Sequence, residues 1–134
     1  MISRVAFAAV AWLFLACVVI QVFLAGLGVF AGPSNFELHR NFGYIFGLLT
    51  VVMVVIAAIG RLGRRLIGLS ALLVLLFTLQ SVFIAFREGL PAAAALHPVN
   101  ALAIFWVAQL VARDALQLAR ADSGPRGEAE PART

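Results

Sequence analysis

Residues 96–100, Leu-His-Pro-Val-Asn, form a polar interruption at the start of the last long apolar run of the chain. The residues that follow are mostly Leu, Ala, Val, Ile and Phe. Besides His97 in this stretch, the chain has one other histidine, His39, which also stands at the start of an apolar run. The pattern predicts two helices that each begin close to a histidine.

The composition indicates a membrane protein. The chain of 134 residues is 63% hydrophobic and 12% charged, with a mean hydropathy of +1.05. Soluble domains are about 45–50% apolar and about 25% charged, so we expect the lipid bilayer to be the main partner of this chain. Its ten basic residues are all Arg and lie mainly between or beyond the apolar runs. That placement is typical of topology signals, and we expect no nucleic-acid partner.

Apolar runs without charge predict four membrane spans, at about 5–30, 36–60, 66–86 and 97–113. A helix crosses a bilayer with about 20 residues, whereas the apolar part of a signal peptide has only about 7–15, so the first run is predicted to remain as a span. The predicted fold class is therefore all-α, a transmembrane four-helix bundle over residues 1–120. Residues 121–134 have the composition of a disordered tail.

The arginines predict the orientation of the spans. An even number of spans puts both termini on one side of the membrane, together with the larger group of arginines: Arg4, Arg61, Arg64, Arg65, Arg113, Arg120, Arg126 and Arg133. Arg40 and Arg87 fall on the opposite side. By the positive-inside rule the crowded side is cytoplasmic, so we expect N-in and C-in topology in a bacterial cytoplasmic (inner) membrane, with a cytoplasmic tail.

The starts of spans two and four carry local signals. Ser34 and Glu37 have the spacing of a capping box, which predicts a helix start near Asn35. Span four has two alternative starts. It begins at Pro98 with His97 as its cap, or at Pro91 with a kink at Pro98.

The two halves of the chain resemble each other. His39 follows Gln21 by 18 residues, and His97 follows Gln80 by 17. Each half would be a helical hairpin with one intramembrane glutamine and a histidine at the head of its second helix, which makes a parallel repeat about an axis along the membrane normal. Spans two and four would then lie diagonally in the bundle, with His39 and His97 facing each other near the outer surface.

Two facing imidazoles in a helical bundle can hold haem iron from both sides. We therefore hypothesise one b-type haem with His39 and His97 as axial ligands. Ligation by two histidines leaves no open position on the metal, which favours electron transfer or haem handling with a redox or membrane-complex partner. A structural zinc would require four ligands, and the sequence offers no cysteine or carboxylate cluster for one.

Four further residues complete the predicted site. Gly43 and Ala101, one turn below the histidines, would give the ring clearance. Arg40 and Arg87, on the outer side, would pair with haem propionates.

The alternative hypothesis is a non-catalytic accessory or structural membrane protein without cofactor, in which the histidines cap helices or bond to loops. The intramembrane polar residues Gln21, Gln80 and Asn100 are expected to face the bundle interior, where they form interhelical hydrogen bonds. No Ser-His-Asp or Cys-His arrangement is evident, which argues against an enzyme, and we predict no catalytic residues. The sequence carries no signal for an oligomeric state.

Several segments are similar to known families: residues 21–30, His39-Arg40 with Gly43, Gln80, and residues 95–102. They resemble a family of short bacterial four-span membrane proteins of unknown function, over roughly the whole chain except the tail.

A more distant similarity is to haem A synthase and other b-type cytochrome bundles, in which helices two and four begin with haem-ligating histidines. This resemblance implies haem binding by His39 and His97. Haem A synthase has a Glu three residues before its first histidine, whereas Glu37 here lies two before His39. The resemblance, which covers one bundle half, therefore does not imply synthase activity or a catalytic role for Glu37.

Overall fold

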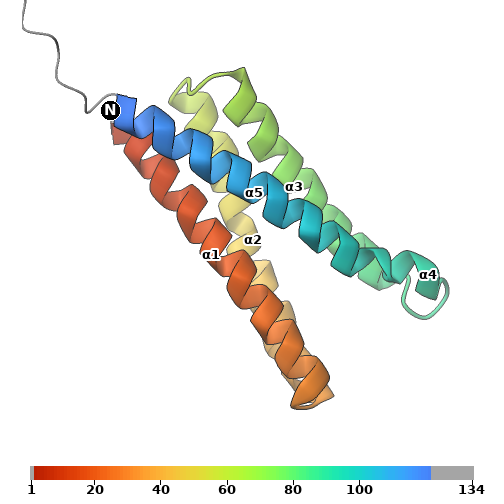
Figure 1. Ribbon diagram of the computed structural model, residues 1–134. Coiled ribbons are helices and arrows are strands. Elements are labelled where there is room, and N and C mark those ends of the chain that lie inside the picture. Colours follow the sequence, from red (N-terminus) through yellow and green to blue (C-terminus); the bar gives the residue numbers. More distant parts are fainter. Residues whose placement is uncertain (1, 122–134) are drawn as a thin grey trace, which may run out of the picture.

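The computed structural model describes residues 2–121, and every regular element in that part of the chain is helical. The predicted all-α fold is thus confirmed. Of the predicted tail, Ala121 is the last helical residue, and residues 122–134 lie outside the described part. The elements, shown in Figure 1, are α1 (Ile2–Phe30), the short 3-10 helix η1 (Pro33–Asn35), α2 (Phe36–Ile59), α3 (Arg64–Ala85), α4 (Pro91–Ala94) and α5 (Leu96–Ala121).

Four helical segments are long and apolar enough to cross a membrane: α1, η1 with α2, α3, and α4 with α5. Large apolar side chains also cover their outer surfaces, as Leu102 (71% exposed) and Ile45 (69% exposed) do on α5 and α2. Apolar surface of this extent is stable against lipid chains and not against water. The protein is accordingly a multi-pass membrane protein.

The start of α2 differs from the prediction. Ser34 lies inside η1, and neither η1 nor α2 has a side-chain cap, so the capping box is not formed. The chain turns at Gly32, whose φ of 131° suits glycine, and Pro33 then begins the 3-10 turn. Within that turn the Asn35 side-chain amide donates to the Gly32 carbonyl at 3.1 Å.

The fourth span extends from Pro91, one of the two predicted starts, but its helix is interrupted at Ala95 and not at Pro98. Pro91 starts the separate helix α4, the chain turns at Ala95, and α5 starts at Leu96. Pro98 is the third residue of α5, inside the first turn, where a helix needs no backbone N–H from it. Proline is therefore accommodated at this position, and His97 lies in the first turn of the helix.

The helices form a four-membered ring of contacts. α1 packs against α2 and α5, and α3 packs against the same two helices. α2 and α5 are therefore diagonal, as the repeat predicts. In Figure 1 the hairpin of α1 and α2 and the hairpin of α3 and α5 meet near the N-terminus and diverge toward the end that carries α4.

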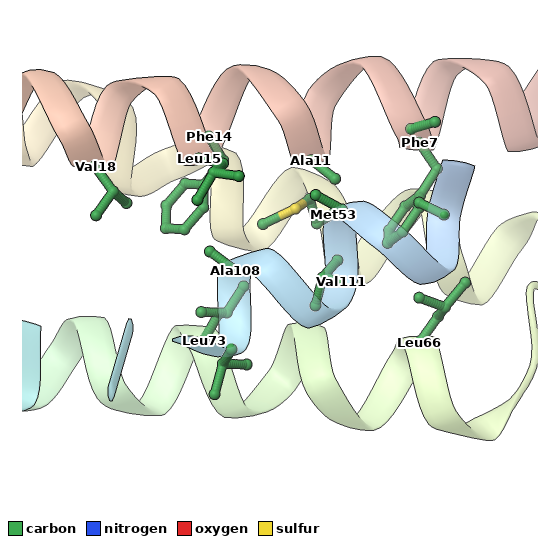
Figure 2. Packing of buried hydrophobic residues seen from close by; sticks show 14 of the residues in the cluster. Phe7, Ala11, Phe14, Leu15, Val18, Met53, Leu66, Leu73, Ala108 and Val111 are labelled. Atoms are coloured by element: carbon green, nitrogen blue, oxygen red, sulfur yellow. The ribbon is translucent and has the colours of Figure 1, made fainter. Parts of the chain in front are cut away.

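The hydrophobic core lies on the side where the hairpins meet. Figure 2 shows Phe7 and Phe14 of α1, Met53 of α2, Leu73 of α3 and Val111 of α5 directed into this core, and all five are fully buried. Rings of Phe14, Phe42, Phe46 and Phe77, with centroids 5.1–6.2 Å apart in contacting pairs, form an aromatic layer at the border of the core toward the histidines.

Burial repeats between the two halves. In α1 and α3, buried residues recur 59 positions apart: Phe7 and Leu66, Ala11 and Ser70, Phe14 and Leu73. In α2 and α5 they recur 58 positions apart: Phe46 and Ile104, Thr50 and Ala108, Met53 and Val111, Ala57 and Ala115. Positions related in this way are called equivalent below. The two hairpins are therefore the same packing unit used twice, which supports the repeat predicted from Gln21 and Gln80.

Candidate functional site

The structure brings His39 of α2 and His97 of α5 together. Their ring centroids are 6.2 Å apart, and the ring planes are inclined by 62°. Both side chains are half-buried. Because α2 and α5 lie diagonally and their backbones do not pack on each other, the two imidazoles reach toward each other between the hairpins.

Each imidazole is held by the helix that precedes its own. His39 Nδ1 donates to the backbone carbonyl of Gln21 at 3.1 Å, and His97 Nδ1 donates to the carbonyl of Gln80, also at 3.1 Å. A carbonyl oxygen only accepts, so in each neutral ring the proton is on Nδ1 and the lone pair is on Nε2. The same bond to a backbone carbonyl commonly orients histidines that bind metals through Nε2.

The side chain of Gln21 fills the space next to His39. Its Nε2 donates to the His39 backbone carbonyl at 2.9 Å and lies 3.3 Å from His39 Nε2. A Cβ added to Gly43 would be 2.8 Å from Gln21 Nε2, so the clearance that Gly43 provides is taken by this amide. Gln21 Oε1 is buried without a hydrogen-bond partner.

The other two intramembrane polar residues lie beside His97. Asn100 is buried, and its Nδ2 donates to the Leu76 carbonyl at 2.8 Å and to Gln80 Oε1 at 2.9 Å. The amide of Gln80 is thus held by α5. All three predicted polar residues form interhelical hydrogen bonds, as expected inside an apolar bundle.

The remaining predicted site residues surround the histidines at this end. Ala101 is half-buried one turn below His97, while Arg40 and Arg87 are exposed. Arg87 Nη2 lies 3.4 Å from Glu88 Oε1. Sequence reasoning missed Phe36, whose ring packs over Gly28 and stands perpendicular to the His39 ring with centroids 6.2 Å apart.

Apolar burial is sparse around the histidines. The core cluster ends at Phe46 and Ile104, each seven residues beyond a histidine in its helix. Within residues 2–121, the buried residues on the histidine side of that limit are Leu24, Gly28, Gly43 and Asn100. The same part of the chain has no group of three or more His, Cys, Asp or Glu side chains placed to hold a metal ion. The histidine pair is thus a group of two such side chains.

A family model described as a family of unknown function, DUF6220, matches residues 21–87. The matched segment contains Gln21, His39 and Gln80 and ends before α5. No curated protein and no solved structure matches the chain. The predicted resemblance to a family of unknown function is thereby confirmed over residues 21–87. The similarity to haem A synthase receives no support from these comparisons.

Proposed function

Because the chain belongs to the DUF6220 family, whose function is unknown, we propose a function from the site itself: the protein binds one b-type haem between α2 and α5. His39 and His97 would hold the haem iron in this proposal. The role would be electron transfer or haem handling in a bacterial cytoplasmic membrane, with both termini cytoplasmic and the histidines near the outer face.

The spacing and tautomer of the histidine pair carry the proposal. A metal–imidazole bond of about 2 Å puts the ring centre roughly 3 Å from the metal, so two ligands on opposite sides have centres roughly 6 Å apart. The observed separation is 6.2 Å. Both Nδ1–H groups donate to backbone carbonyls. In each ring the lone pair available to a metal is therefore on Nε2.

The surroundings of the pair fit a porphyrin better than a bare ion. Two protein ligands suffice when a macrocycle supplies the other donors, whereas a structural metal ion requires more of them. The hairpins diverge toward this end, and the buried core stops seven residues short of each histidine. Gln21 would have to withdraw its amide from His39 Nε2 before this atom could bind iron.

The protein groups around the ring would have distinct roles. Arg40 and Arg87 are exposed on the histidine side and would pair with propionates. Ala101 and Gly43 lie one turn below the imidazoles, and the Gln21 amide would have to leave the space next to Gly43 for the ring to fit. When bound, haem would supply one-electron redox chemistry. A single haem near one face provides no relay across the whole membrane, so a redox or membrane-complex partner would have to reach that face.

A second candidate function is a structural role without cofactor. The two Nδ1 hydrogen bonds connect α1 to α2 and α3 to α5, so they already join the two helices of each hairpin in the protein alone. In that case the protein would be a non-catalytic accessory protein of a membrane complex.

Absorbance spectroscopy separates the two candidates. The protein is expressed with ample haem, purified in detergent and compared with His39→Ala, His97→Ala and the control Thr78→Ala, which removes an exposed hydroxyl bonded within α3. We expect a Soret band that changes or disappears in either histidine variant and is unchanged in the control. A colourless, monodisperse wild-type protein would exclude haem binding and favour the structural role.

A further inference from the structure

The two glutamines next to the histidines hold their side-chain amides differently, although their backbone carbonyls accept equivalent hydrogen bonds. Both N–H groups of the Gln21 amide point at His39, with its carbonyl oxygen 2.9 Å and its Nε2 3.3 Å away. The amide of Gln80 is directed to Asn100 instead, whose Nδ2 donates to Gln80 Oε1 at 2.9 Å. The pseudo-symmetry of the bundle is thus broken at the Nε2 atoms, which are the atoms proposed to bind iron.

Two substitutions between the halves explain this difference. The residue equivalent to Gly43 is Ala101, 58 positions later. A Cβ at position 43 would be 2.8 Å from the Gln21 amide nitrogen, so the amide reaches His39 only beside a glycine, and Ala101 carries the methyl group that excludes the same arrangement. The residue equivalent to Asn100 is Phe42, which has no amide to draw Gln21 away.

We propose that Gln21 is a built-in competitor for His39, which makes His97 the permanent axial ligand and His39 an exchangeable one. The inference rests on the proposed haem site. A hydrogen bond to Nε2 uses the lone pair that a metal would need, so Gln21 and iron exclude each other at His39. With His39 held by Gln21, His97 alone would hold the haem, which could then also bind a small neutral ligand of the carbon monoxide type.

The first test measures carbon monoxide binding to the ferrous, haem-loaded protein in detergent. Gly43→Ala should displace the flexible Gln21 amide, hold His39 on the metal and weaken apparent carbon monoxide affinity about fivefold to tenfold, the effect of one ordinary hydrogen bond. The matched control is Gly68→Ala in α3, where an added Cβ meets open space. Equal affinities in wild type and Gly43→Ala would overturn the proposal.

The second test compares the two histidine variants by titration with haem. His39→Ala should keep haem through His97 and still bind carbon monoxide, whereas His97→Ala should lose at least about tenfold more haem affinity, because its remaining ligand is shared with Gln21. Equal losses, or a greater loss in His39→Ala, would contradict the order of the two ligands.

A measurement on the haem-free protein makes the result independent of cofactor loading. Nitrogen NMR of the two imidazoles should show Nδ1–H rings in both, and Gly43→Ala should shift the Nε2 signal of His39 but not that of His97. An unchanged His39 Nε2 signal in Gly43→Ala would mean that the Gln21 amide does not compete for this atom. A wild-type protein that binds no haem would refute the haem site and this inference with it. If the wild type binds haem but the variants do not differ in carbon monoxide or haem affinity, only the inference is refuted.

Discussion

The two ends of the bundle are stabilised in different ways. Where the hairpins meet, all four helices contribute buried apolar side chains, and seven pairs of equivalent positions are buried in both halves. At the histidine end fewer apolar side chains are buried, and His39, His97, Gln21 and Asn100 form hydrogen bonds between helices. Packing is thus concentrated at the end that fixes the fold, and polar groups are concentrated at the end that carries the candidate site.

This contrast matters for a membrane protein. Lipid chains are as apolar as leucine, so close packing and interhelical hydrogen bonds hold helices together. A tightly packed core resists insertion of a ligand because it has no voids of that size. An end held by a few polar contacts can rearrange around one. The contrast predicts large effects of truncation in the core and smaller effects near the histidines.

The largest effect is expected for Phe14→Ala in the core. Phe14 is fully buried and contacts the rings of Phe46 and Phe77, with centroids 5.5 and 6.2 Å away. Removing such a ring from a packed interior costs about 3–5 kcal/mol. The free energy of unfolding, measured by denaturing-detergent titration, should fall by this order. Phe86→Ala at the histidine end, where the ring is 47% exposed, should cost far less, and equal losses would refute the contrast between the ends.

Gly47→Ala is expected to have an intermediate effect, because it tests the border between the two ends. A Cβ at this position would overlap the ring of Phe77, a member of the aromatic layer. Overpacking of this kind costs about 1–3 kcal/mol. Gly26→Ala is the matched control, since an added Cβ there meets open space. If Gly47→Ala unfolds no earlier than Gly26→Ala in the same titration, the aromatic layer is not tightly packed.

The sequence predicted the parts of the fold that depend on apolar runs and on the spacing between polar residues. The four spans, the diagonal placement of α2 and α5 and the approach of His39 to His97 all follow from these features. The start of α2 did not follow, because the Gly32-Pro33 turn continues into a 3-10 helix that takes Ser34 out of the capping position. The start of α5 did not follow either, because the break falls at Ala95, and Pro98 is tolerated inside the first turn of the helix that follows.

The detail of the site was beyond sequence reasoning for a different reason. Gly43 was predicted to leave room for a ligand, but the free volume next to a glycine is available to any nearby side chain. Here the amide of Gln21 fills it. Which of the two glutamines turns toward its histidine depends on a single methyl group at Ala101 and on the partner that Asn100 offers. Such a choice depends on side-chain conformations that periodicity does not determine.

The smallest of the three stability effects is expected for Asn100→Ala at the histidine end. Asn100 Nδ2 bridges Leu76 and Gln80 of α3, and interhelical hydrogen bonds in membranes contribute about 0.6 kcal/mol on average and about 1.7 at most. We therefore expect a loss of unfolding free energy in this range, well below that of Phe14→Ala. The freed Gln80 amide should also perturb the imidazole nitrogen signals of His97 and leave those of His39 unchanged. A loss as large as that of Phe14→Ala would mean that polar contacts, and not the apolar core, hold α3 and α5 together.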